Sequence, residues 1–469
     1  MLESFGDLIV TIADFVCGYP MFFTLIGGGL FLFIYSGAVS LRRLPYAIAA
    51  LRTKSDAKNG QISSAQALAS VVAATVGLGN IAGVCIALVM GGPGAIFWLW
   101  VSALVGMCTK YHEGVLAIMY KGKDNEGKPQ GGPMYIIERG LGMKWKPLAI
   151  SFAIAGMFGT MCIMNANQLA EGAVATFTTP EWIAGNEFLS TVSSFTSLDN
   201  LQSFKLVFGT IVAAIVAVVV LGGIKRIANV ATILVPFMVG AYFLMVLYII
   251  ISHIGDVPEV FASIFHEAFS LKAGWGALIG IALIGARRAA LVNDAGVGTA
   301  SIMHGASRND QPVREGLVAM LGPSIDSGLV CTLTALAILL CGNIDVEGVK
   351  GLQIAMEAFN NAIPGGKYWL MIIVICFGMS SMFSYSFYGN RCASYLFGAK
   401  NAKYYTYLFI LSLIVFAVVD ADKAVGVCDL FYGLMAFPTM FAILRLSPKV
   451  KKVTQEYFAK EKQKKIISR

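Results

Sequence analysis

Two glycines and an asparagine interrupt an apolar run that is long enough to cross a lipid bilayer. The interruption is Gly77-Leu78-Gly79-Asn80, inside the run 66–90. In hydrocarbon, an unwound turn exposes N–H and C=O groups without partners, so it persists only where protein buries it or where it lines a cavity. Freed N–H groups suit a carboxylate and freed carbonyls suit a cation. The pattern therefore indicates a ligand or ion site, although tight helix packing through the glycines, including Gly83, would explain the same residues.

Asp326 is the most unusual ionisable residue, because it lies well inside the apolar run 314–341. Ionisable residues within membrane spans are functional hypotheses by default. Asp326 could pair with a cation, relay protons or stabilise a helix break at Pro323. A coupling role and a structural role both remain open for this carboxylate.

A second group of charged residues, Lys110, His112 and Glu113, lies toward one end of the run 95–119. Long charged side chains near a helix end can reach the membrane surface while their stems stay in apolar surroundings. We therefore expect a local ion-pair cluster at the membrane surface here, and not a substrate contact.

The composition is that of a polytopic membrane protein. Of 469 residues, 57% are hydrophobic and only 13% are charged, and the 50 glycines are typical of closely packed membrane helices. The nine cysteines form no CxxC pair and the four histidines are scattered, so we expect neither disulfides nor a metal cluster. The sequence has no GxxxxGK[ST] motif and no nucleophile–base pair, which argues against an ATP-driven pump and against an enzyme.

Eleven apolar runs are long enough to span a bilayer, which needs about 20 residues. They are 20–38, 66–90, 95–119, 147–174, 206–222, 229–252, 258–290, 314–341, 367–390, 404–420 and 424–446. The seventh is the least regular, because it begins with His266, Glu267 and Lys272 before a glycine-rich apolar part.

The distribution of lysine and arginine predicts which side is cytoplasmic. With eleven crossings and the N-terminus outside, the inner segments hold 29 of these residues and the outer segments hold 5. The C-terminus is then cytoplasmic, and its basic tail, 447–469, favours contact with anionic lipid over contact with nucleic acid. Apolar residues between 5 and 16 recur at helical spacing, which predicts an amphipathic helix on the membrane surface.

Several motifs in order resemble the alanine or glycine:cation symporters, and the resemblance covers nearly the whole chain. They include "AATVGLGNIAGVCIALVMGGPGAIFWLW" (73–100), "GGPMYIIERGLG" (131–142), "NDAGVGTASIMHGA" (293–306) and "SFYGNRCASYLFG" (386–398). This resemblance, and a likeness of the 77–80 stretch to the neurotransmitter:sodium symporters, implies an all-α leucine-transporter-like fold with two inverted five-helix repeats.

The resemblance also implies an organisation of the chain into four parts. Residues 1–65 would hold the amphipathic segment, one extra membrane helix and a cytosolic linker. The two repeats would be 66–252 and 253–446, and 447–469 would be the cytosolic tail. A second break would fall at 274–280, opposite the first.

By the same resemblance, the backbone N–H groups of Leu78 and Gly79 would hold the substrate carboxylate. The Na⁺ ligands would be the carbonyls of Ala73 and Val76, the carbonyl of Phe377, and the hydroxyls of Ser380 and Ser381. The Thr75 carbonyl and the Asn80 amide oxygen would serve a second cation or the substrate. The other expected substrate-binding residues are Gly77, Asn165, Trp275 and Tyr385.

The chain departs from the family pattern at or near the expected pocket. The family usually has Thr at Leu78, Gln at Asn165, Trp at Tyr385, and Glu at Asp294. We therefore predict an inner-membrane transporter that imports a small neutral amino acid with Na⁺, with alanine or glycine as the first candidates and serine or glutamine as further ones. Proton coupling is the alternative within this class, and a cation channel is the rival from another class. Its partners would be the amino acid and the bilayer, with no nucleic acid and no organic cofactor.

Overall fold

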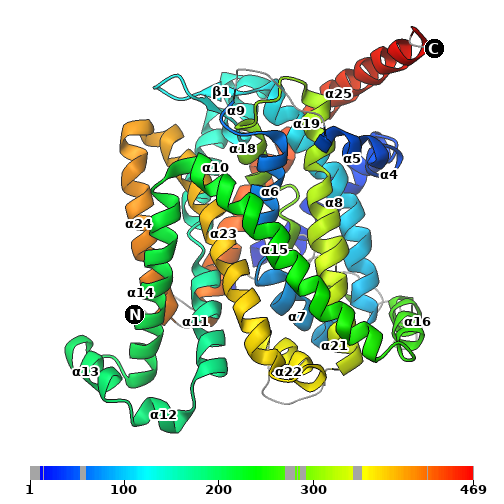
Figure 1. Cartoon of the computed structure of the whole chain (residues 1–469). Helices are drawn as coiled ribbons and strands as arrows, with labels where there is room; N and C mark the ends of the chain where they lie inside the picture. Colours follow the sequence, from blue (N-terminus) through cyan, green and yellow to red (C-terminus); the bar gives the residue numbers. More distant parts are fainter. Residues whose placement is uncertain are drawn as a thin grey trace.

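The computed structural model describes residues 11–13, 15–52, 60–269, 280–281, 284–285, 292–341, 351–419 and 421–467, and these residues are helical almost throughout (Figure 1). A small antiparallel sheet pairs β1 (Gly122–Lys123) with β2 (Pro129–Gln130). The predicted amphipathic segment at 5–16 falls mostly outside the described residues, as do Trp275 and most of the predicted second break at 274–280.

Within the described residues, eight helices are long and apolar enough to cross a membrane, and a bent pair raises the number to nine. The eight are α8 (Gly94–Met119), Met143–Phe177 with α10 (Lys146–Gly159) and α11 (Ile163–Phe177), α14 (Asn200–Val220), α15 (Gly223–Ser252), Pro312–Cys341 with α19 (Pro312–Ala319), α20 (Leu321–Pro323), η5 (Ser324–Val330) and α21 (Cys331–Cys341), α23 (Gly366–Phe397), α24 (Ala399–Val418), and Leu430–Gln463 within α25 (Ala421–Ile467). The bent pair is Ser64–Thr75 with Gly79–Gly91. The chain is therefore an all-α, multi-pass membrane protein.

Two of the eleven predicted spans are not matched by a helix of spanning length among the described residues. The first, 20–38, coincides with a shorter apolar helix, Tyr19–Tyr35, made of α2 (Tyr19–Phe22), η1 (Phe23–Gly27) and α3 (Gly28–Tyr35). The seventh, 258–290, begins with α16 (Val257–Ala268) and continues largely outside the described residues. The count of eleven and the inverted repeat stay predictions.

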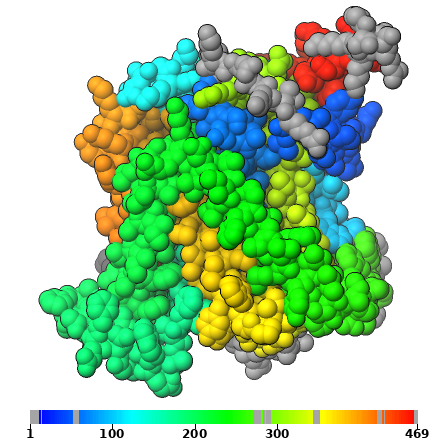
Figure 2. Space-filling model, in the orientation of Figure 1, coloured from blue at the N-terminus to red at the C-terminus, as the bar shows by residue number. Residues whose placement is uncertain are grey.

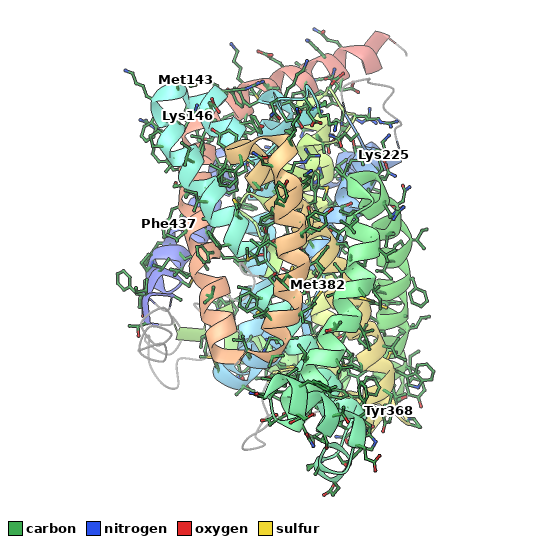
Figure 3. All side chains as sticks on the ribbon, turned by 90° about the vertical axis from the view of Figure 1, so that its left-hand side faces the viewer. Met143, Lys146, Lys225, Tyr368, Met382 and Phe437 are labelled. Atoms are coloured by element: carbon green, nitrogen blue, oxygen red, sulfur yellow. The ribbon has the colours of Figure 1, made fainter. Side chains whose placement is uncertain are left out.

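Shorter elements gather at the two ends of the molecule (Figure 1). One end carries the β1–β2 hairpin and the C-terminal part of α25, together with α4 (Val39–Arg42), α5 (Leu44–Arg52), α9 (Pro133–Tyr135), η3 (Ile136–Leu141) and α18 (Thr299–Gly305). The opposite end carries α16, α12 (Pro180–Ala184), α13 (Glu187–Thr196) and α22 (Leu352–Ala362). Lys146 and Lys225 lie toward the first end and Tyr368 toward the second (Figure 3). We refer to the first end as the basic end.

The centre of the bundle is formed by α6 (Ser64–Thr75), α8 and α23. The membrane-spanning parts of α8 and α23 are mostly buried, whereas α14, α15 and α24 expose most of theirs. The front face in Figure 2 is covered by α14, α15 and α22, and α12 and α13 project from it at the lower left. The broken helix predicted from the sequence is therefore enclosed by other helices, as unpaired backbone groups in a membrane require.

A capping box fixes the start of α6. The Ser63 hydroxyl accepts from the Gln66 backbone N–H at 3.2 Å, and the Gln66 side chain accepts from the Ser63 N–H at 2.9 Å. Two orphan donors are thereby satisfied at the first turn. The cap therefore fixes the start of α6, the helix that ends at Thr75.

Two further spans contain irregular backbone. Cys162 has φ 54°, so the chain turns in the left-handed region between α10 and α11. The seven residues of η5 form a π-helical segment that contains Asp326. Such π segments are frequent at functional sites. The irregular segment at the first break and η5 pack against each other.

Candidate functional site

The predicted break in the first core helix is present. Ser64–Thr75 and Gly79–Gly91 are bent by 56° across Val76–Leu78, and Val76 is extended at φ −77° and ψ 92°. The second part begins with η2 (Gly79–Gly83) and continues as α7 (Val84–Gly91). The backbone N–H groups of Leu78 and Gly79 donate to no other described residue. Two free donors therefore lie at the start of a half-helix.

Asn80 closes the turn at the break. Its side-chain oxygen accepts from the Gly77 N–H at 2.9 Å, and its own N–H donates to the Gly77 carbonyl at 3.1 Å. The amide nitrogen of Asn80 donates to the Asp326 carbonyl at 3.2 Å and lies 3.5 Å from the Cys331 sulfur. In this structure the Asn80 oxygen is thus occupied within the turn, and the side chain connects the break to η5.

Four oxygens from two helices converge beside the break, and we call them the oxygen cluster: the carbonyls of Ala73 and Phe377 and the hydroxyls of Ser380 and Ser381. Ser380 Oγ lies 3.0 Å from Ala73 O and 2.9 Å from Phe377 O. Ser381 Oγ lies 3.3 Å and 3.1 Å from the same two carbonyls. The bonds to Phe377 are ordinary back-bonding within α23, but those to Ala73 join two helices.

The oxygen cluster lies near the middle of the molecule. Met382, which follows Ser381 in α23, is at about mid-height between the two ends in Figure 3. Ser380, Ser381, Ala73 and Phe377 are all buried. A methyl group built on Gly77 would lie 2.7 Å from Ser381 Oγ, so the absence of a side chain at Gly77 permits this close approach.

The other predicted cation ligands are less directly connected to this cluster. The carbonyls of Thr75 and Val76 accept no hydrogen bond from Ser380 or Ser381 in the part of the chain that the structure describes. The Thr75 hydroxyl donates to the Val71 carbonyl at 3.2 Å and lies beside the Asp326 carboxyl group.

Tyr385 is anchored by a carboxylate that sequence reasoning did not connect with it. The Tyr385 hydroxyl donates to Asp294 Oδ2 at 2.8 Å, and the Thr299 hydroxyl donates to the same oxygen at 3.2 Å. Asp294 is buried and has φ 52°, so it occupies the left-handed region in a turn that also contains Gly296 and Gly298. The phenol is therefore committed to a protein partner in this structure.

Asn165 lies in the first turn of α11, directly after the left-handed Cys162. Its side chain is buried, and within the described residues it makes no hydrogen bond to Tyr385 or to the oxygen cluster. The sequence offers one signal for this break, Gly159, which is the last residue of α10.

The expectation that Lys110, His112 and Glu113 reach the membrane surface is wrong. All three side chains are buried, because α8 lies in the centre of the bundle and packs against α18, α19 and η5. Glu113 Oε1 accepts from the Gly296 N–H at 2.6 Å, and His112 Nδ1 lies 2.7 Å from the Cys108 carbonyl. The expected ion pair is not formed either, because Lys110 Nζ has no carboxylate oxygen within 4.0 Å in the described part of the chain.

A different buried ion pair lies between α18 and α19. His304 Nδ1 and Glu315 Oε1 are 2.6 Å apart, and both side chains are fully buried. The other carboxylate oxygen accepts from Ser64 at 2.7 Å and from Asn309 at 3.0 Å. Nearby, outside the spans, Lys121 donates to Ser307 O at 2.6 Å; its pKa is lowered by burial, although Glu315 and Asp310 oppose this shift.

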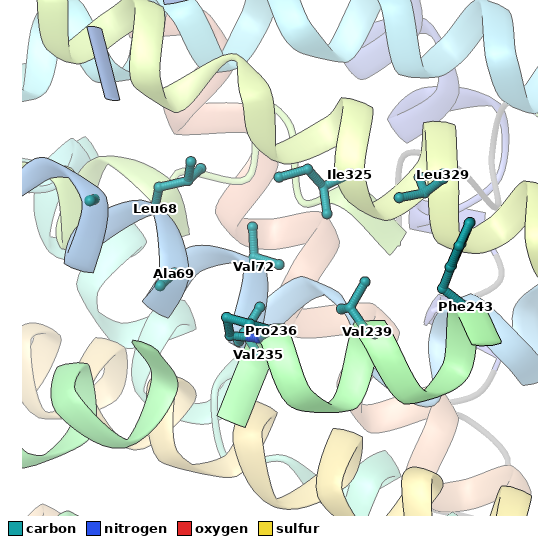
Figure 4. Close-up of a pocket in the computed structure, with 11 residues that line it drawn as sticks. Leu68, Ala69, Val72, Val235, Pro236, Val239, Phe243, Ile325 and Leu329 are labelled. Carbon is teal, nitrogen blue, oxygen red and sulfur yellow. The ribbon is translucent and has the colours of Figure 1, made fainter. Parts of the chain in front are cut away.

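An apolar pocket of about 400 Å³ lies on the other side of η5 (Figure 4). Its lining comes from α6, α15 and η5 and includes Val72, Phe243, Ile325 and Leu329. Ile325 and Leu329 point to this pocket, whereas the neighbouring Asp326 lies beside Thr75 and Asn80. All eleven lining residues are apolar, so this pocket does not suit a zwitterionic amino acid.

Comparison with known proteins gives the same family over the whole chain. The description "Sodium:alanine symporter family" belongs to the family profile that matches residues 2–468. A sodium/alanine symporter of Methanococcus maripaludis is 37% identical over 97% of this chain and 97% of its own. An amino-acid carrier protein of Bacillus subtilis is 32% identical over 98% and 94%. A Bacillus subtilis protein named "Probable sodium/glutamine symporter" is 30% identical over 98% and 92%.

Proposed function

We propose that this chain, which belongs to the sodium:alanine symporter family, imports a small neutral amino acid across the cell inner membrane by symport with Na⁺. Alanine and glycine are the first candidates. Serine and glutamine are further candidates because the pocket residues depart from the family pattern and because one relative carries glutamine in its name. As a member of this family, the chain is a transporter and not an enzyme.

The observation that carries the proposal is the oxygen cluster. Carbonyl and hydroxyl oxygens are the ligands of a hard monovalent cation, and here they come from α6 just before its break and from α23. None of the four oxygens belongs to a titratable group, which favours Na⁺ over a proton at this position. A cation bound there would replace the hydroxyl-to-carbonyl hydrogen bonds and hold the two helices together.

The substrate carboxylate would lie on the free N–H groups of Leu78 and Gly79. The N-terminus of a helix favours negative charge, and η2 begins at Gly79. Gly79 has no side chain to obstruct the ligand, and among the described residues a methyl group built there would meet only Val292, at 3.6 Å. Asn165, Trp275 and Tyr385 would surround the side-chain end of the substrate.

Na⁺ binding and substrate binding would be coupled because only a short chain segment separates the two proposed sites. Ala73 contributes to the oxygen cluster, and Leu78 and Gly79, directly after the same break, would bind the carboxylate. Occupation of one site fixes the break in the geometry that the other site needs, so each ligand raises the affinity for the other by the same factor. Symport then requires both ligands before the helices on either side of the break rearrange.

For the orientation we propose an outer N-terminus and a cytoplasmic C-terminus. The segments at the basic end in Figure 1 are those that hold most of the lysine and arginine outside the spans. This end would face the cytoplasm, and the end with α12, α13 and α22 would face outward.

The decisive experiment is uptake of labelled alanine, glycine, serine and glutamine by proteoliposomes that contain the purified protein. We expect accumulation with an inward Na⁺ gradient and none when K⁺ replaces Na⁺. Uptake driven equally well by a proton gradient without Na⁺ would support proton coupling instead. Ion current in the absence of any amino acid would support a channel, and either result would contradict the proposal.

A further inference from the structure

A buried charge cluster in the centre of the bundle is not used by the proposed cation and substrate sites. Lys110 and Glu113 come from α8, Asp294 from the turn before α18, and Asp326 from η5, and all four side chains are buried. Lys110 acts electrostatically on each of the three carboxyl groups. Asp294 also acts electrostatically on Glu113.

The polar atoms of this cluster are only half satisfied. Lys110 Nζ is buried without a hydrogen-bond partner and has no carboxylate oxygen within 4.0 Å in the described part of the chain. Glu113 Oε2 and Asp294 Oδ1 are likewise buried and unpartnered among the described residues. Their other oxygens accept from the Gly296 N–H and from Tyr385 and Thr299. Buried polar atoms of this kind are rare without a partner, which can be an ordered water, an ion or a proton on the carboxyl group itself.

The charge balance points to the nature of that ligand. If Lys110 and the three carboxyl groups were all ionised, one positive charge would face three negative ones in a membrane interior, where uncompensated charge is expensive. A metal ion is not favoured, because the described residues contain no group of three carboxylate, histidine or cysteine side chains that could hold one. Two buried carboxyl groups that lie near each other can lower their combined charge by binding a proton, because both are not easily ionised together.

We propose that Glu113 and Asp294, beside Lys110, share a proton that is released when Na⁺ binds at the oxygen cluster. On release, the O–H bond of one carboxylic acid breaks, the proton passes to bulk water, and the carboxylate keeps the negative charge. This inference rests on the proposed function for the identity of Na⁺ and adds a second, proton-binding site to it.

Na⁺ and this proton repel each other through a short connection. Ser381, in the oxygen cluster, lies four residues before Tyr385 in α23, which is about one helical turn, or ~5.4 Å of rise. The Tyr385 hydroxyl contacts Asp294 directly. A positive charge at Ser381 therefore disfavours a proton on the Glu113–Asp294 pair, and by linkage the proton weakens Na⁺ binding.

Other polar groups face the pair and Lys110 from α23, α18 and η5. From α23 these are Tyr385 and Tyr388, and the Tyr388 hydroxyl is also buried and unpartnered among the described residues. From α18 they are Thr299 and the Ser301 backbone. Asp326 faces Lys110 from η5. Lys110 is the cation that acts on both Glu113 and Asp294. Its charge keeps the pair able to lose a proton.

The test measures the Na⁺ concentration for half-maximal amino-acid uptake in proteoliposomes at pH 5.5, 7.0 and 8.5. If Na⁺ displaces one proton, this concentration should fall as the pH rises. Below the pKa of the pair it falls by up to about tenfold per pH unit, and we expect a fall of at least about threefold between pH 5.5 and 8.5. In Glu113→Gln and Asp294→Asn the change should shrink to less than about twofold. Glu171 pairs with Lys205 away from this cluster, so the control variant Glu171→Gln should keep the parent's pH dependence.

A second measurement does not depend on the variants folding. In weakly buffered detergent solution, addition of NaCl to the unaltered protein should release protons, reported by a pH-indicator dye, whereas KCl should release none. Na⁺-dependent uptake with a pH-independent half-saturation and no proton release would overturn the proton site alone. Uptake that needs no Na⁺ at any pH would instead contradict the proposed function.

Discussion

The Tyr385 hydroxyl lies 2.8 Å from Asp294 Oδ2, so the side chain predicted to line the substrate pocket is held by a buried carboxylate. Asp294 itself is positioned by its left-handed backbone and by Thr299, which donates to the same oxygen. The link connects α23, which carries the oxygen cluster, to the turn that precedes α18. It means that the position of the aromatic ring depends on a residue nearly a hundred positions away.

Replacement of Tyr385 by Phe removes this link and keeps the ring. A hydrogen bond to a charged group contributes about 1.5–3 kcal/mol, so we expect the substrate concentration for half-maximal uptake to rise by about tenfold or more. Uptake kinetics at saturating Na⁺ measure it, with Tyr404→Phe on the exposed surface of α24 as the matched control. An unchanged value in Tyr385→Phe would mean that the ring serves packing alone.

Replacement of Ser380 or Ser381 by Ala removes one oxygen from the cluster beside Ala73. A dehydrated cation that loses a ligand binds more weakly, so the Na⁺ concentration for half-maximal uptake should rise by about tenfold in each variant, and further in the double variant. Ser386→Ala is the control, because that hydroxyl donates within its own helix, to the Phe383 carbonyl at 2.7 Å. If the double variant keeps the parent's Na⁺ dependence, this site assignment is wrong.

Gly79 and Gly77 allow the binding and packing explanations of the break to be separated. In the described part of the chain, a methyl group on Gly79 meets only Val292, at an ordinary 3.6 Å, whereas one on Gly77 meets Ser381 Oγ at 2.7 Å. Gly79→Ala should therefore fold normally but lose substrate affinity by about tenfold or more, because the methyl group occupies the approach of the carboxylate. Gly77→Ala should mainly raise the Na⁺ concentration for half-maximal uptake. Normal substrate affinity in Gly79→Ala, measured by uptake, would favour packing as the reason for the glycine.

Replacement of Glu315 by Gln breaks the buried pair with His304 and presents an N–H₂ group to donors at Ser64 and Asn309. Removal of one partner from a buried ion pair costs about 3–5 kcal/mol. The thermal midpoint of the purified protein in detergent should fall clearly, while Glu181→Gln on the exposed α12 should leave it unchanged. A midpoint within one degree of the parent's would contradict a stabilising role for this pair.

The sequence predicted the parts of this structure that depend on local pattern. The break at Gly77-Leu78-Gly79-Asn80 follows from residue type, and the proximity of Ser380 and Ser381 to Ala73 was implied by family resemblance; both are found in the structure. The burial of Lys110 and Glu113 was missed, because it depends on the packing of α8 against α18, α19 and η5, which are distant in the chain. The left-handed Cys162 was also missed, since cysteine is not a residue type that favours this conformation.

The specificity of the pocket can be tested through the two side chains that are smaller than their counterparts in the family. Tyr385 replaces the usual Trp, and Asn165 is one methylene shorter than the usual Gln, so both changes enlarge the expected pocket. A methylene in a binding pocket discriminates by about 1–3 kcal/mol, which favours a broadened choice of substrate over a complete switch. The parent protein should therefore accept serine or glutamine besides alanine and glycine.

The double variant Tyr385→Trp, Asn165→Gln should narrow that choice toward glycine and alanine. The indole fills the space beyond the Tyr385 ring, and the longer amide of Gln extends from the first turn of α11, where the left-handed Cys162 fixes the start of the helix. Competition of unlabelled amino acids against labelled alanine measures the profile, and Tyr404→Trp on the exposed α24 controls for the added indole. Because Trp also loses the hydroxyl that bonds to Asp294, comparison with Tyr385→Phe separates the effect of volume from that of the lost hydrogen bond. If the double variant and the parent show the same profile, these two positions do not line the substrate pocket.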